Sequence, residues 1–195
     1  MAEKNYKTPK KLPKYQSKEV IFSILDKAKK DSYRNYIMLM TLWRTGIRLS
    51  ELSKIRKSDI KDGNLIVRNG KGGKDRTVPL EGELENLLGL YSDNMKPNEE
   101  LFDIKERQIR NIVYKYSNYH TGTRLNKKTG KEENINIYEV HPHTFRHSFA
   151  VHCLKNGINL RSLQKILGHS SLTTTQVYLD VLGKDVKDDF DKVEW

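Results

Sequence analysis

The chain has 195 residues, of which 36% are hydrophobic and 31% charged, and its 36 basic against 25 acidic residues give a net charge of +11. No apolar stretch approaches the roughly 20 residues that a membrane span needs, and the N-terminus lacks the apolar segment of a signal peptide. Cys153 is the single cysteine, which excludes an intrachain disulfide and favours a small core residue in the apolar run AVHCL. We therefore expect a cytoplasmic protein with a nucleic-acid partner, although anionic membranes and acidic proteins also attract a basic surface.

The N-terminal third is expected to begin with an arm and continue in helices. Residues 1–16 contain five lysines and two prolines, which predicts a flexible basic arm that contacts phosphates, or a plain disordered terminus. Helical spacing of apolar residues begins after Ser17, a good N-cap residue, and returns in a richly apolar segment over 33–44. Gly46 can end that second helix, and a third should start near Ser50.

In the middle of the chain the spacing of the apolar residues changes from a helical pattern to one typical of strands. Residues 65–67 and 77–80 are typical of two short strands, and the glycines between them predict a β-hairpin. Helical patterns resume over 83–92 and 105–118. Residues 120–137 are polar and predict an exposed loop or a small hairpin.

The C-terminal third again shows helical patterns. We expect helices over 144–156, 160–167 and about 173–181, the first two ended by glycines, and a last amphipathic segment over 186–193. The whole pattern predicts an α+β fold that is mostly α-helical and carries a small β-hairpin sheet.

Four side chains with phosphate chemistry lie within 36 residues of one another near the C-terminus, namely His143, Arg146, His169 and Tyr178. Arginine binds phosphate oxygens with a planar fork and stays charged. Histidine transfers protons, and a tyrosine hydroxyl can form a covalent intermediate. This combination indicates covalent chemistry on a nucleic-acid backbone without a metal.

Two other kinds of site compete for these residues. Four histidines (His141, His143, His147 and His152) raise the alternative of zinc, but there is no HExxH and an arginine lies between two of them. The segment 70–74, GKGGK, lacks P-loop spacing and leads into a strand, so nucleotide hydrolysis is not indicated.

Four segments resemble the signature segments of the tyrosine recombinases, the phage integrase and Xer group: TGIRLSEL, GKGGKDRTVPL, HPHTFRHSFA and LGHSSLTTTQVY. They occur in the family's order within about residues 17–181. The resemblance implies the catalytic-domain fold of that family over 17–195. It also leads us to expect that the separate N-terminal core-binding domain of many members is absent.

The resemblance gives roles to residues far upstream of the C-terminal cluster. Arg48 would be the first phosphate clamp and Arg146 the second. Lys71, on the hairpin, would protonate the leaving 5′ oxygen, with Lys74 as a rival for this role. A surface arginine or a turn lysine is the plain alternative for each.

The same resemblance implies roles for the remaining residues of the site. His143 would take the tyrosine proton or hold the phosphate, His169 would hydrogen-bond the phosphate, and Tyr178 would be the nucleophile. Glu51 would orient the site, or it would form a simple surface ion pair. Helix-end histidines and a half-buried packing tyrosine are the structural alternatives.

The implied function is site-specific recombination through a 3′-phosphotyrosyl intermediate, independent of metal, ATP and cofactors. The partner would be double-stranded DNA, with a homotetramer on DNA, a monomer allowed in solution, and no membrane. Two alternatives are a DNA-binding module that keeps the fold without recombining and a topoisomerase of type IB chemistry. The complete residue set argues against the first, and the compact LGHSSLTTTQVY segment argues against the second.

Overall fold

The computed structural model describes residues 13–68, 75–125, 130 and 132–182. Along the chain the elements are α1 (Lys18–Asp31), α2 (Tyr33–Thr45), α3 (Leu49–Leu52), the 3-10 turn η1 (Lys57–Asp59), β1 (Ile60–Lys61), β2 (Asn64–Val67), β3 (Arg76–Pro79), α4 (Gly82–Ser92), α5 (Glu106–Tyr116), β4 (Tyr119–Leu125), β5 (Glu132–Tyr138), α6 (Pro142–Lys155), α7 (Leu160–Leu167) and α8 (Thr173–Leu182). The predicted α+β fold, mostly helical with a small sheet, is confirmed.

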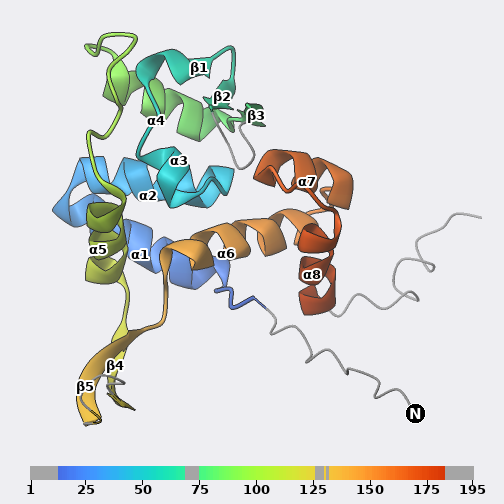
Figure 1. Cartoon of the computed structure of the whole chain (residues 1–195). Helices are drawn as coiled ribbons and strands as arrows, with labels where there is room; N and C mark the ends of the chain where they lie inside the picture. The colour runs from blue at the N-terminus through green and yellow to red at the C-terminus, as the bar shows by residue number, and fades with distance from the viewer. Residues whose placement is uncertain (1–12, 69–74, 126–129, 131, 183–195) are drawn as a thin grey trace, which may run out of the picture.

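Helices α2 and α6 form the centre of the molecule. Helix α2 packs against α1, α4 and α6, and α6 also contacts α7 and α8 (Figure 1). Nine of the 13 residues of α2 are buried, which is why its sequence is apolar without a clear stripe. Gly46 ends the helix with a φ of 61°, as predicted.

The predicted hairpin is the larger part of a three-stranded antiparallel sheet with the order β1-β2-β3. Leu65 pairs with Val78, and both side chains are buried. Strand β1 was not predicted; it joins β2 through Asp62 and Gly63, both at positive φ. An Asp-Gly pair suits such a two-residue turn, so this signal was present in the sequence.

The polar segment before α6 is a hairpin, so the second of its two predicted forms is confirmed. Strands β4 and β5 pair from Tyr119↔Tyr138 to Leu125↔Glu132. Figure 1 shows this two-stranded arm extending away from the helical body.

The two ends of the chain are described in part. Residues 1–12 of the predicted arm and the predicted segment 186–193 lie outside the described residues. Just before α1, the backbone N–H of Gln16 donates to the Ser148 hydroxyl on α6 at 2.8 Å. Within the described ranges, no helix combines the length and the apolar character that a membrane span requires.

Candidate active site

Arg146 links three helices at the centre of the site. It lies on α6 with 4% of its surface exposed, and its guanidinium donates to the carbonyl of Gly46 at 2.6 Å and to that of Leu167 at 2.7 Å. These carbonyls lie at the C-terminal ends of α2 and α7, where backbone oxygens lack helical partners. Burial, together with the charge of Arg48, lowers the pKa of Arg146 to about 10, so it remains a cation at neutral pH.

Glu51 joins two arginines beside Arg146. Its carboxylate accepts from Arg48 Nη1 at 2.9 Å and from both terminal nitrogens of Arg76 at 2.8 Å each. Burial by itself raises the pKa of Glu51, but the hydrogen bonds from Arg76 and Arg48 outweigh burial and hold the pKa at about 2. Only 8% of Glu51 is exposed, so the alternative of a simple surface ion pair is wrong.

Tyr178 is buried on α8, with 2% of its surface exposed. Its hydroxyl lies 2.9 Å from Nδ1 of His147 on α6. Burial raises the pKa of Tyr178, and the charges of Arg146 and Arg48 oppose that rise. Burial lowers the pKa of His147 to about 4, with His143 and Arg146 adding to the effect, so this imidazole is neutral at pH 7 and can accept the tyrosine hydrogen.

The two predicted histidines are also neutral at pH 7. Nδ1 of His169 lies 2.9 Å from the hydroxyl of Thr175. Burial first, and then the charges of Arg146, Arg48 and Arg76, lower the pKa of His169 to about 4. Burial first, and then the charges of nearby arginines, Arg146 foremost, lower the pKa of His143.

Five of the six predicted catalytic residues line one pocket of about 220 Å³: Arg48, His143, Arg146, His169 and Tyr178. The sixth, Lys71, and its rival Lys74 lie outside the described residues. The fold thus brings the end of α2, the start of α6 and the α7–α8 junction to a single cationic cavity. Among the described residues, no three His, Cys, Asp or Glu side chains are grouped so as to hold a metal ion.

Two residues of the site were missed by sequence reasoning. Arg76 shares a strand face with buried Val78, because side chains two apart on a strand point the same way. His147 shares a helix face with His143 four residues earlier, a spacing that was considered only for zinc. The inward-facing strand position of Arg76 and the four-residue spacing of His143 and His147 were therefore the available signals. Neither signal identified Glu51 as the partner of Arg76 or Tyr178 as the partner of His147.

Comparison with known proteins agrees with this geometry. A profile of the phage integrase family matches residues 14–184. Tyrosine recombinase XerA of Pyrococcus furiosus is 37% identical over 191 residues, which cover 95% of this chain and 63% of that protein. The crystal structure of XerA recombinase superposes with a TM-score of 0.68 at 27% identity, covering 98% of this chain and 68% of that one. The XerH site-specific recombinase, solved bound to its difH substrate, shares the fold with a TM-score of 0.62 at 22% identity, over 95% of this chain and 55% of that one.

The fold is therefore the one that tyrosine recombinases share. The chain belongs to the phage integrase family. It spans 63% of the length of the Pyrococcus relative.

Proposed function

We propose that this chain is the catalytic part of a site-specific DNA recombinase that cleaves and rejoins strands through a 3′-phosphotyrosyl link. The observation that supports it most is the single pocket in which two arginines, three histidines and Tyr178 meet. The names of the relatives agree, and the XerH structure holds a DNA substrate in the same fold.

In the proposed reaction, the Tyr178 oxygen attacks phosphorus while the bond from phosphorus to the 5′ oxygen breaks. Arg48 and Arg146 neutralise the charge that builds up on the non-bridging oxygens. Arg146 uses one N–H on each of two carbonyls, so three of its five donors remain for phosphate. Lys71 protonates the 5′ oxygen, and attack by a 5′ hydroxyl reverses every step.

The tyrosine proton goes to His147 in this proposal. His143 was expected either to take it or to hold the phosphate, but His147 is the histidine whose Nδ1 lies within hydrogen-bonding distance of the Tyr178 hydroxyl. Its neutral state at pH 7 leaves that nitrogen free to accept a proton. His143 and His169 then hold the phosphate.

We further propose that residues 17–195 form the catalytic domain, that the protein acts on double-stranded DNA in the cytoplasm, and that four copies assemble on the DNA. Sedimentation with and without a duplex tests the assembly. A tetramer that forms only with DNA is expected, and a DNA-bound monomer under conditions that support strand exchange would contradict it.

Suicide substrates test the chemistry. A pool of nicked duplexes with a randomised core is incubated with the protein in EDTA, and covalent adducts are detected on a denaturing gel. Adducts should form and should be lost in Tyr178→Phe. A metal-dependent cut without bound protein would exclude the mechanism, and adducts without Holliday junctions would favour the topoisomerase.

The proton acceptor is tested with His147→Gln, which keeps a hydrogen-bonding group near Tyr178 but cannot take up a proton. Adduct formation at pH 7 should slow by about 100-fold, which is the lower range for a general base. His152→Gln is the matched control, because His152 lies on the same helix beside Trp43 and outside the pocket. An unchanged rate in His147→Gln would return the role to His143.

A further inference from the structure

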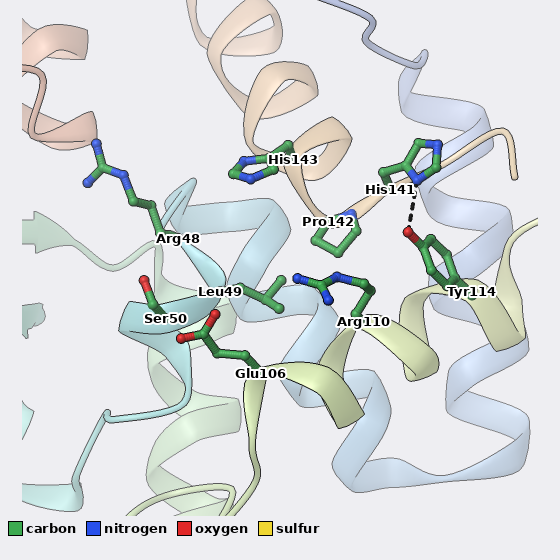
Figure 2. Close-up of a pocket in the computed structure, with 9 residues that line it drawn as sticks. All are labelled: Arg48, Leu49, Ser50, Glu106, Arg110, Tyr114, His141, Pro142 and His143. Atoms are coloured by element: carbon green, nitrogen blue, oxygen red, sulfur yellow. Dashed lines mark hydrogen bonds between the residues drawn. The ribbon is translucent and has the colours of Figure 1, made fainter. Parts of the chain in front are cut away.

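A second cavity adjoins the catalytic pocket and is larger than it. Its volume is about 330 Å³, and its walls come from the start of α3, the exposed side of α5 and the start of α6 (Figure 2). Arg48 and His143 line both cavities, so the two spaces share a boundary. A group bound in one cavity would therefore lie next to a group bound in the other.

Arg110 is the cation that belongs to the second cavity alone. It is exposed on α5, beside the apolar face that Ile109 and Val113 bury in the core. Figure 2 shows its guanidinium directed between Leu49 and Pro142. Among the described residues, its side chain makes no hydrogen bond or ion pair, and its charge contributes to lowering the pKa of His143.

The remaining walls combine the apolar side chains of Leu49 and Pro142 with polar ones. The Tyr114 hydroxyl and His141 Nδ1 lie 3.1 Å apart, and their rings meet edge to face at 5.5 Å, so this pair closes one side (Figure 2). The Ser50 hydroxyl makes no hydrogen bond with any described residue. Glu106 adds one carboxylate, one helical turn before Arg110.

The charges of this cavity fit an anion with one negative charge. Arg48 and Arg110 both line this space, and Arg48 is already paired with Glu51, so an anion in the cavity would supply the counter-charge for Arg110. Arginine also donates several hydrogen bonds in one plane, which suits phosphate oxygens. The carboxylate of Glu106 disfavours a second anion. A single phosphodiester has the required charge and acceptor atoms.

We propose that this cavity binds the DNA phosphate adjacent to the scissile phosphate, with Arg110 as its anchor and the Ser50 hydroxyl as a second donor. The inference rests on the proposed function, because it takes the scissile phosphate to lie between Arg48 and Arg146. Contacts to backbone phosphates fix the register of a protein on DNA. Arg110 is thus a positioning residue that helps to place one particular bond at Tyr178.

The first test measures binding to a non-specific duplex as a function of salt, using the whole chain. The slope of log K against log [salt] should become shallower by about 1 in Arg110→Ala, and Arg110→Lys should restore most of it. Glu106→Gln should bind more tightly than the wild type. Arg107→Ala removes an equal charge from α5 outside the cavity and should change the slope less.

Equal effects of Arg107→Ala and Arg110→Ala would overturn the proposal, because they would show only a general loss of positive charge. An unchanged slope in Arg110→Ala would also overturn it. Each variant is compared with the wild type by thermal melting, and Arg110 is exposed, so the fold is expected to persist. These readouts do not need cleavage, so they stay informative even if Tyr178 forms no adduct.

The second test identifies the phosphate. On a duplex that forms the Tyr178 adduct, single uncharged methylphosphonates replace the phosphates flanking the scissile one. One replacement should weaken wild-type binding to the level of Arg110→Ala and should not weaken that variant further. If every replacement weakens both proteins equally, Arg110 does not contact a flanking phosphate.

Discussion

The site depends on a carboxylate that does not itself carry the proposed chemistry. Glu51 touches Arg48, one of the two proposed phosphate clamps, and holds Arg76 with two hydrogen bonds of 2.8 Å. An arginine side chain has many rotamers, and fixing it costs conformational entropy. Glu51 supplies that fixation for Arg48 before DNA arrives, so we expect both stability and activity to depend on it.

We predict that Glu51→Gln lowers the free energy of unfolding by about 3 kcal/mol, because it leaves two arginines without their counter-charge at a largely buried position. Urea unfolding measures the loss. Glu83→Gln is the control: Glu83 pairs with Arg44 at 3.1 Å, but its side chain is 54% exposed, so less than about 1 kcal/mol should be lost. Equal losses in the two variants would show that burial does not strengthen the Glu51 pairs.

The site residues that could be identified from the sequence are those that occur at a fixed place in a recognisable motif. Arg48, Arg146, His169 and Tyr178 each occur in a recognisable segment, and the fold brings all four to one pocket. The partners within that pocket could not be predicted in the same way. The Tyr178–His147 contact joins α8 to α6, and its existence depends on how these helices cross rather than on any local pattern.

At the scale of elements, the end of α7 is built around a side chain from the sheet. Gly168 ends the helix with a φ of 65°, and a Cβ atom there would lie 2.8 Å from Cδ and 3.0 Å from Nε of Arg76. The same Nε donates to the carbonyl of Ile166. Any side chain at 168 must therefore displace Arg76, which would loosen its contact with Glu51.

Gly168→Ala should for this reason resemble Arg76→Ala in both stability and adduct formation, and the double variant should be worse than Arg76→Ala only by the backbone strain of an alanine at position 168, where φ is 65°. Gly157→Ala is a matched control. Gly157 also has positive φ, at 86°, but a Cβ there meets no atom within 4 Å. It should lose only about 1 kcal/mol from backbone strain. Additive losses in the double variant would mean that Gly168 acts independently of Arg76.

Elements were predicted best where one physical signal dominated. Gly46 marked the end of α2 because the helix closes in a left-handed conformation. The two-residue strand β1 was missed because it has too few residues for a period, although the Asp62–Gly63 turn beside it was visible. For residues 120–137 the sequence predicted either a loop or a hairpin, because this polar segment shows little alternation of apolar and polar residues.

At the scale of the whole molecule, one apolar core connects the helices and the sheet. It includes Ile21 on α1, Leu65 on β2, Phe145 on α6 and Leu163 on α7. The pocket lies over this core, so its imidazoles are removed from water and lose protons more readily than they would in the unfolded chain. Folding and the protonation of the site are therefore linked.

This linkage predicts that the protein is less stable at pH 5 than at pH 7.5. His147 and His169 have pKa values of about 4 in the folded state, against an ordinary value near 6.5, so between these pH values the unfolded chain binds protons that the folded chain does not. The contribution of these two histidines to the free energy of unfolding is fully present above about pH 6.5 and is lost as the pH falls toward 4. Both rings are partly open to solvent, which screens the effect, so we discount it to about 1 kcal/mol each at pH 5.

Glu51 does not affect this window, because its pKa of about 2 makes its contribution disappear only at lower pH. His143 and His152 have lowered pKa values too and act in the same direction. The melting temperature should therefore fall by about 4–8 °C from pH 7.5 to pH 5, given about 2–4 °C per kcal/mol for a chain of this size. Replacing His147 and His169 together with glutamine should flatten most of this dependence. A melting temperature that stays constant or rises toward pH 5 would contradict the linkage between burial of the pocket and its protonation.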